Sequence, residues 1–298
     1  MSPDTCHLAL PENFRTRDFL EFHSRDGTAY AEKVSHDTLQ KGLVYQGSPT
    51  CLTIRFTDCH VEANLAGDRP NTEPGKPHGL FLVRRMLGLT QNVEVFEQAY
   101  RLHPTLGALI ARHPGLRIPL SATPFEALTW AVTGQQISVS VATTLRRKLI
   151  QAAGIVHSGG LACHPDAEHI AALSMEDLRR AGFSQTKAQT LHTLSRMVLS
   201  GELPLESWLT DIPPADTISE KLLRIKGIGP WTVSYGLLRG FGWLDGSLHG
   251  DAAVRRGLQK LLQTSEKISE DQTRQWLAEF SPWRALVAAH LWALNREA

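Results

Sequence analysis

Cysteine is scarce in this sequence, and its few copies are widely separated. The chain of 298 residues has four cysteines with no Cys-x-x-Cys pair among them, namely Cys6, Cys51, Cys59 and Cys163. Structural zinc sites and cysteine-bound iron–sulfur clusters need closely spaced thiolates, and small secreted proteins depend on paired cysteines. We therefore expect no disulfide, no metal site built from side chains and no four-cysteine iron–sulfur cluster.

Long apolar runs and an excess of one charge are also missing. No apolar run reaches the roughly 18 residues that a membrane span needs, and the first residues, MSPDTCHLALPENF, lack the pattern of a signal peptide. The 31 basic and 30 acidic residues leave a net charge of +1, so any DNA-binding surface must be a local patch. With 42% hydrophobic residues, the chain is expected to be a soluble intracellular protein.

Residues 1–88 have the pattern of an α+β subdomain. Phe19 and Phe22 indicate an early helix that packs on a sheet, and a turn region at 67–79 precedes a further helix at 80–87. Alternating apolar and polar residues predict short strands at 29–34, 42–46, 51–56 and 60–65. We expect a mixed sheet that serves as a packing platform.

Residues 89–298 are predicted to be almost wholly helical. Thr123 and Pro124 are the residue types of a helix N-cap and first position. Gly134 is unfavourable inside a helix, so it indicates a helix junction or a close approach. Gln135 and Gln136 follow it, and their amides either contact DNA bases and fill the gap left by a displaced base, or are simply solvated.

Two further helical segments contain residues of interest. Residues 177–191 predict a helix–turn–helix pair with Gly182 at the end of its first helix. Lys187 in the second helix either approaches a DNA backbone or is solvated. Near the end of the sequence, Ser281 and Pro282 are predicted to cap and begin the last helix.

The most informative stretch is residues 217–240, which predicts a helix–hairpin–helix. An apolar helical pattern breaks at Lys226-Gly227-Ile228-Gly229, and a proline follows where the next helix begins. Ile228 is expected to plug the turn between the two helices. Backbone N–H groups at such a turn bind anions, and Lys226 adds a positive charge. We expect these four residues, together with Thr232, to bind a DNA phosphate.

Asp251 opens the segment DAAVRR beyond the hairpin. An aspartate there can cap the helix that follows, or act as a catalytic carboxylate, and one residue can do both. Asp245, in a Leu-Asp-Gly turn, is the alternative carboxylate. Trp231 and Tyr235 are four residues apart on one helical face, a spacing found in cores as well as in binding sites.

These motifs together resemble the helix–hairpin–helix DNA glycosylase superfamily, and within it the DNA-3-methyladenine glycosylase II group. The resemblance extends from about residue 101 to residue 292 and rests on the segments IKGIGPWTVSY, DAAVRR, HPGLR, PFEALTWAVTGQQISVSVATTLRRKLI and PWR…HLW. It implies that Asp251 is catalytic and that Trp231, Tyr235 and Trp292 line a base pocket. It also implies that Gln136 enters the duplex, where the family often has leucine, and that hairpin carbonyls bind a monovalent cation.

The function implied is that of a monofunctional glycosylase, which removes alkylated purines from duplex DNA and leaves an abasic site. An alkylated purine is a cationic leaving group, so one carboxylate beside the sugar can suffice once the base is flipped out. Strand-cleaving relatives place a lysine nucleophile two residues after the second hairpin glycine, where this chain has Trp231. No dissociable cofactor and a monomeric protein are expected.

Two alternative functions stay open at this point. The first is a non-catalytic protein that binds DNA through its hairpin. The second is a glycosylase with the same scaffold that acts on deaminated or oxidised bases. Such an enzyme would differ from an alkylpurine glycosylase only in the details of its base pocket.

Overall fold

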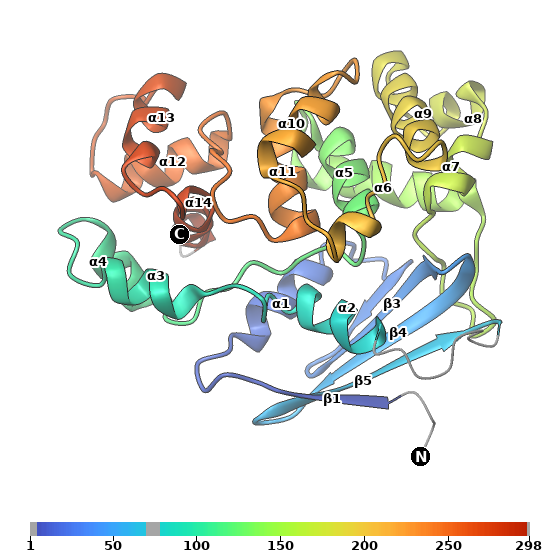
Figure 1. Cartoon of the computed structure of the whole chain (residues 1–298), viewed down its shortest axis with the longest axis horizontal. Helices are drawn as coiled ribbons and strands as arrows, with labels where there is room; N and C mark the ends of the chain where they lie inside the picture. Colours follow the sequence, from blue (N-terminus) through green and yellow to red (C-terminus); the bar gives the residue numbers. More distant parts are fainter. Residues whose placement is uncertain (1–4, 70–77, 297–298) are drawn as a thin grey trace.

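A computed structural model describes residues 5–69 and 78–296. A five-stranded sheet lies at one end of the molecule and the helices lie to one side of it (Figure 1). The strand order is β1-β5-β4-β3-β2, and the strands are β1 (Thr5–Ala9), β2 (Glu32–Val34), β3 (Thr38–Tyr45), β4 (Ser48–Phe56) and β5 (His60–Gly67). The α+β class is confirmed.

The sheet is antiparallel in all of its strand pairs, so the expectation of a mixed sheet was wrong. Short turns join β2, β3, β4 and β5, and a short turn can connect only antiparallel neighbours. The predicted strands lie within or overlap β2 to β5, whereas β1 was not predicted. The predicted turn region at 67–79 lies mostly outside the described residues.

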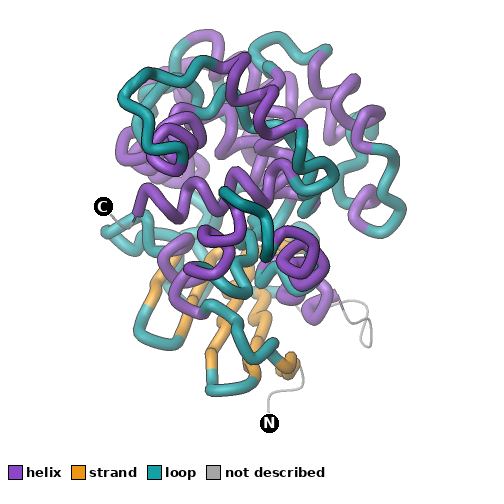
Figure 2. Tube along the Cα trace, turned by 90° about the vertical axis from the view of Figure 1, so that its left-hand side faces the viewer, coloured by secondary structure: helices purple, strands orange, loops and turns teal. Residues whose placement is uncertain are grey.

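Two helices cover one face of the sheet, α1 (Thr16–His23) and α2 (His78–Met86). Phe19 of α1 and Met86 of α2 are buried in one apolar cluster with Leu52 and Ile54 of β4. The alternation that predicted β4 therefore does separate a core face from an outer face. Seen at right angles, the helices again lie on one side of the strands (Figure 2).

The rest of the described chain is helical, as predicted. Its α-helices are α3 (Val93–Tyr100), α4 (Leu106–Arg112), α5 (Pro124–Gly134), α6 (Val139–Ala153), α7 (Ala167–Ala172), α8 (Met175–Arg180), α9 (Gln185–Leu199), α10 (Ala215–Leu223), α11 (Pro230–Gly236), α12 (Ala252–Leu261), α13 (Glu270–Ala278) and α14 (Arg284–Arg296). A 3₁₀ turn, η1 (Ser207–Leu209), precedes α10, and a π-helical turn, η2 (Leu237–Phe241), continues α11. None of the helices in the described part combines the length and apolar character needed to cross a bilayer.

Most of the predicted helix ends are confirmed. Thr123 accepts a hydrogen bond from the Glu126 N–H over 3.0 Å and caps α5, which ends at Gly134. Gly182 follows α8 with a φ of +100°. The prediction for the last helix was wrong, because α14 begins at Arg284, and the Ser281 hydroxyl donates to a side chain instead of capping it.

Helix α11 lies where two apolar clusters meet. One cluster joins α3, α4, α12 and α14, and it includes Tyr235 of α11. The other joins α5, α9 and α10, and it includes Val233 of α11. In Figure 1, α12, α13 and α14 lie on the left, and α5 to α9 lie towards the right, with α10 and α11 between them. The two faces of α11 therefore pack against different groups of helices and connect the two apolar clusters.

A buried network of charges fastens the sheet to the helices. Nζ of Lys41 lies 2.6 Å from carboxylate oxygens of both Glu32 and Glu126, and Arg146 bridges the same two carboxylates over 3.1 and 2.9 Å. Although burial raises the pKa of Glu126, the charges of Lys41, His164 and Arg146 hold it down, at about 2. Because separating these partners would leave buried charges uncompensated, the network fixes β2 and β3 against α5 and α6. The boundary at residue 88 stays a prediction.

Candidate active site

The hairpin between α10 and α11 is a tight glycine turn. The Ile225 N–H bonds to the Leu222 carbonyl and the Ile228 N–H to the Ile225 carbonyl, each over 3.0 Å. Gly227 has a φ of +92°, and a Cβ there would lie 2.1 Å from Oγ1 of Thr190. Only glycine fits this position without strain. Ile228 is 6% exposed within an apolar cluster, so the prediction that it plugs the turn is confirmed.

The outer side of the hairpin presents backbone N–H groups. Gly229 is the N-cap of α11, and the first bond of that helix runs from the Val233 N–H to the Gly229 carbonyl. The N–H groups of Trp231 and Thr232 precede that bond, so they lie in the first helical turn, where N–H groups have no partner within the helix. A Cβ at Gly229 would meet open space, and Lys226 is exposed. This is the geometry of an anion site, and phosphate binding here stays a prediction.

Gln135 hydrogen-bonds to the hairpin through its amide nitrogen, and its expected contact with DNA stays a prediction. Its amide nitrogen donates to the Gly227 carbonyl and to Oγ1 of Thr232, each over 2.8 Å. The Thr232 side chain is correspondingly buried, so only the backbone of that residue can meet a phosphate. Gln136 is exposed with a φ of +56° at the junction of α5 and α6. The entry of Gln136 into the duplex stays a prediction.

Lys187 was expected to approach a DNA backbone or to be solvated, and in the structure it bonds to the protein backbone. Its Nζ donates to the carbonyl oxygens of Thr133 and Gln135, each over 2.8 Å. These carbonyls end α5, where a positive charge is favourable. Burial lowers the pKa of Lys187. The residue therefore supports the helix end that carries the two glutamines.

The hairpin carbonyls are the expected site of a monovalent cation. The Lys226 carbonyl accepts a bond from Oγ1 of Thr190 and the Gly227 carbonyl accepts one from Gln135, each over 2.8 Å. A carbonyl oxygen has two lone pairs, so each oxygen keeps one for a cation. The donor set fits the group, and the cation stays a prediction.

Asp251 is the N-cap of α12, as expected. Its Oδ1 accepts bonds from the N–H groups of Ala253 and Val254, over 2.8 and 3.0 Å. The indole N–H of Trp292 also donates to Oδ1, over 3.3 Å, and that of Trp231 donates to Oδ2 over 3.1 Å. The carboxylate is therefore held in place by the backbone of its own helix and by indoles from α11 and α14.

The predicted aromatic residues surround one cavity beside this carboxylate. The cavity has a volume of about 400 Å³ and is lined by Asp251, Trp231, Tyr235 and Trp292 among others. Trp231 and Tyr235 stack with ring centroids 5.2 Å apart, and Tyr235 and Trp292 are tilted at 6.4 Å. A mostly apolar cavity of this size is typical of small-ligand sites. The structure thus brings the four predicted residues together.

Asp245, the alternative carboxylate, is hydrogen-bonded to residues at and just before the start of α14. It receives two bonds from the Arg284 guanidinium, over 2.7 and 3.0 Å, and one from the Ser281 hydroxyl over 2.9 Å. It does not belong to the described lining of the cavity. Asp245 holds the start of α14 and is not the catalytic candidate.

Comparison with known families shows to which superfamily the chain belongs. Residues 129–282 match the family model described as HhH-GPD superfamily base excision DNA repair protein. The chain belongs to the HhH-GPD superfamily. The matched residues run from α5 to the segment just before α14, and they contain the hairpin and Asp251.

Individual relatives of this HhH-GPD protein agree with that membership. A DNA-3-methyladenine glycosylase of Bacillus subtilis is 26% identical over 97% of this chain and 96% of its own. Another B. subtilis protein named as a DNA-3-methyladenine glycosylase is 31% identical, and the chain spans 64% of its length, just under two thirds. The solved structure of a 3-methyladenine DNA glycosylase from Archaeoglobus fulgidus covers 98% of both chains with a TM-score of 0.82 at 22% identity, which shows the same fold.

Several residues of this HhH-GPD pocket were missed by sequence reasoning. Phe22 lies in the pocket lining, and the guanidinium groups of Arg25 and Arg239 lie 4.3 and 4.5 Å from the centroid of its ring. Trp130 of α5 also lines the pocket, and its indole N–H donates to the Tyr235 hydroxyl over 3.0 Å. Phe22 had been expected only to pack on the sheet. Arg239 could have been found, because it continues the four-residue spacing of Trp231 and Tyr235.

Arg239 places a buried positive charge against the aromatic residues. Its guanidinium donates to the Pro119 carbonyl over 2.7 Å and lies 5.9 and 5.5 Å from the rings of Tyr235 and Trp292. Burial lowers the pKa of Arg239 to about 10, so the side chain is still charged at neutral pH. The pocket therefore contains a cation and a carboxylate at different places on its wall.

Proposed function

We propose that this protein is a monofunctional DNA glycosylase that removes alkylated purines from duplex DNA inside the cell. It acts as a monomer and leaves an abasic site. The observation that carries the proposal is Asp251, whose carboxylate lines the aromatic cavity and is held by the indoles of Trp231 and Trp292. The names of its relatives support the same substrate class.

Each part of the site has a role in this reaction. The hairpin N–H groups hold a phosphate, and Gln136 occupies the gap left when the base is turned out of the stack. Trp231, Tyr235 and Trp292 offer aromatic faces, which attract an electron-poor or cationic base. Asp251 then stabilises the positive charge that develops on the sugar as the N-glycosidic bond breaks, and it orients the attacking water.

The monofunctional character is supported by what lines the cavity. A strand-cleaving step through a Schiff base needs a lysine amine beside the sugar. Trp231 occupies the position at which the strand-cleaving relatives have that lysine, and none of the described residues around the cavity is a lysine. Water is therefore the nucleophile in the proposed reaction.

One observation favours a second substrate class, deaminated or oxidised bases. Arg25, Arg239 and Arg296 line the cavity. Guanidinium groups bind carbonyl oxygens well and repel a cationic base. A neutral base with an added carbonyl oxygen, such as a deaminated adenine, matches these donors.

The test compares wild type with Asp251→Asn. Base release is measured from methylated duplex DNA and from DNA that contains deaminated adenine, with DNA binding recorded in the same samples. We expect wild type to release methylpurines, and the variant to bind DNA without releasing them. In the variant, an amide N–H replaces Oδ2 and faces the Trp231 indole N–H, so thermal unfolding is recorded as well.

The other outcomes decide between the alternatives. Release of only the deaminated base would assign the second substrate class. DNA binding with no release by either protein would favour a non-catalytic DNA-binding module. Equal release by wild type and variant would mean that Asp251 only caps α12.

A further inference from the structure

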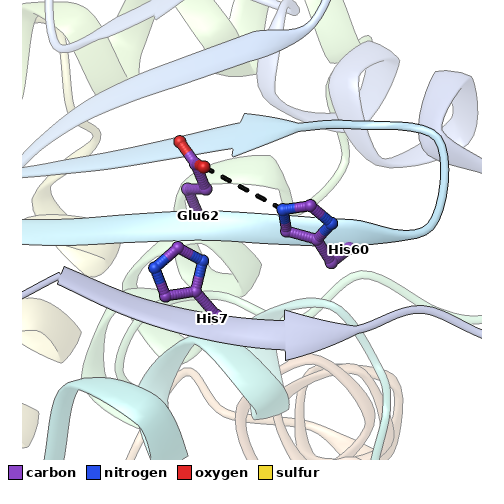
Figure 3. Close-up of side chains that lie close together, drawn as sticks. All are labelled: His7, His60 and Glu62. Atoms are coloured by element: carbon purple, nitrogen blue, oxygen red, sulfur yellow. Dashed lines mark ion pairs between the residues drawn. The ribbon is translucent and has the colours of Figure 1, made fainter.

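A second group of candidate ligands lies on the outer face of the sheet. His7 comes from β1, and His60 and Glu62 come from the neighbouring strand β5 (Figure 3). His7 stands across from Glu62 in the strand register, and His60 precedes Glu62 by two residues on the same face. The alternate residues Leu8 and Val61 are buried in the cluster that contains α1 and α2. The three polar side chains therefore point away from the core.

The Thr57 hydroxyl is the partner of the other ring nitrogen of His60, because its oxygen lies 2.9 Å from both Nδ1 and the carbonyl oxygen of that residue. When the hydroxyl donates to the carbonyl, its oxygen accepts a hydrogen bond from Nδ1. The neutral ring then has its proton on Nδ1 and a lone pair on Nε2. A histidine that binds a metal through Nε2 has this arrangement, in which the other ring nitrogen donates to an oxygen.

In this tautomer two acceptors face each other. Nε2 of His60 lies 3.9 Å from Oε1 of Glu62 (Figure 3), which is too long for a direct hydrogen bond. Arg55, the cross-strand neighbour of Glu62 on β4, pairs with Asp37 over 3.7 Å. A cation between the imidazole nitrogen and the carboxylate would satisfy both acceptors.

We propose that His7, His60 and Glu62 bind a divalent transition metal ion of the zinc type. Their ligand atoms lie within 4.8 Å of one another. Bonds of about 2.0–2.2 Å place two ligands of a tetrahedral zinc ion about 3.4 Å apart, a spacing that small rotations of these exposed or half-buried side chains reach. Imidazole and carboxylate ligands suit zinc, and three protein ligands leave a fourth position for water.

The consequence of this site is a link between two strands. β1 is an edge strand that pairs with β5 alone in the described sheet. A metal ion held by His7 on one strand and by His60 and Glu62 on the other adds a cross-link to that edge. None of the three residues belongs to the described lining of the aromatic cavity, so the ion stabilises the fold and does not take part in base release.

The experiment measures zinc and cobalt binding to the full-length protein without a histidine tag. Isothermal titration gives the stoichiometry and affinity for Zn²⁺, and the visible absorption of Co²⁺ reports tetrahedral coordination. We expect one ion per chain, and a melting temperature that rises with zinc. Thr57→Val, which removes the oxygen that orients His60, should weaken binding roughly 10- to 100-fold. His7→Ala should weaken it by more.

Matched variants separate this site from other ligands. His36 is an exposed histidine outside the cluster, and the thiol of Cys59 lies 3.7 Å from the opposite nitrogen of His60. His36→Ala and Cys59→Ser should both bind zinc as wild type does. The proposal is overturned if wild type shows no saturable zinc binding, or if His7→Ala binds zinc with unchanged affinity and gives the same cobalt spectrum. Base release should be the same with and without the ion.

Discussion

The indole N–H of Trp231 donates a hydrogen bond to Oδ2 of Asp251 over 3.1 Å. Trp231 lies in the first turn of α11, directly after the hairpin, and Asp251 caps α12. One bond therefore connects the proposed phosphate site to the proposed catalytic carboxylate. In the proposed function, this bond positions the hairpin that binds DNA relative to the group that acts on the flipped nucleotide.

Trp231→Phe tests that connection, because it keeps an aromatic ring beside Tyr235 and removes the N–H. A hydrogen bond to a charged group contributes about 1.5–3 kcal/mol, so the single-turnover rate of base release should fall roughly ten- to hundredfold. Trp276→Phe is the control, because Trp276 is half-buried in an apolar cluster and lies outside the described pocket lining. A Trp231→Phe rate equal to wild type would show that the bond does not assist catalysis.

The two hairpin glycines should respond differently to alanine. Gly227→Ala places a Cβ 2.1 Å from Oγ1 of Thr190 at a φ of +92°, so it should lower the free energy of unfolding by about 1–3 kcal/mol. At Gly229 a Cβ meets open space, and Gly229→Ala should change stability by no more than about 0.5 kcal/mol. Its methyl group should nevertheless weaken DNA binding, because it covers the N–H groups of the turn.

Urea unfolding and DNA titrations on both glycine variants provide the measurement. Gly229→Ala with full DNA affinity would contradict the assignment of the anion site to this side of the hairpin. Gly227→Ala with unchanged stability would mean that Thr190 moves away without cost.

Local sequence patterns were enough to predict the hairpin and the caps of α5 and α12, because those features depend on glycine, proline and aspartate at fixed offsets. The pocket role of Trp231 and Tyr235 was implied by the family resemblance, since their spacing alone is also found in cores. Phe22 and Trp130 carry no such signal, because they reach the pocket from α1 and α5 only through the tertiary fold. The bond from the Gln135 amide to the Gly227 carbonyl also was not predicted, because nothing in its neighbours along the chain indicates it.

The same limit applies to the sheet. His7 meets Glu62 only through the register of β1 against β5, and the strand that carries His7 was not predicted. The charged network of Lys41, Glu32 and Glu126 likewise joins residues far apart in sequence. Pairing between distant segments brings these side chains together. A single amino-acid sequence contains no direct signal of which distant segments pair.

Lys187 and Lys226 provide a matched pair of charges near the proposed DNA surface. Lys187 is bonded to the carbonyls that end α5, whereas Lys226 is exposed on the hairpin. Lys226→Met should reduce the slope of log affinity against log salt by about 0.9. Lys187→Met should leave that slope unchanged and lower the free energy of unfolding by about 1 kcal/mol. Binding titrations over a range of salt concentrations, with urea unfolding, distinguish the two. A reduced slope for Lys187→Met would show that it also contacts phosphate.

Buried histidines should make stability depend on pH. Burial lowers the pKa of His290 to about 3, whereas an unfolded histidine titrates near 6.5. As the pH falls below about 6.5, His290 takes up a proton in the unfolded state but stays neutral in the folded state. The free energy of unfolding therefore decreases progressively until the pH reaches the pKa of the folded state. One such group contributes a slope of about 1.4 kcal/mol per pH unit in that range.

His290→Phe isolates this contribution. It removes the titrating group from a ring cluster that includes Phe96, so the slope of unfolding free energy between about pH 6 and pH 4 should decrease by about 1.4 kcal/mol per unit. Urea unfolding at several pH values measures the slope independently of any constant change in stability. The exposed His36 provides the control as His36→Ala, and an unchanged slope in His290→Phe would show that another group dominates acid unfolding.

We expect the charge of Arg239 to influence which bases the proposed pocket accepts. The guanidinium lies against Tyr235 and Trp292 and is charged at neutral pH. Arg239→Met keeps an unbranched apolar side chain and removes the charge, so release of cationic methylpurines should rise relative to release of a deaminated purine. The ratio of the two products from one mixed substrate is the measurement, because it does not depend on the fraction of active protein. An unchanged ratio would mean that the guanidinium only holds the Pro119 carbonyl and the aromatic rings, and that selectivity comes from the shape of the cavity.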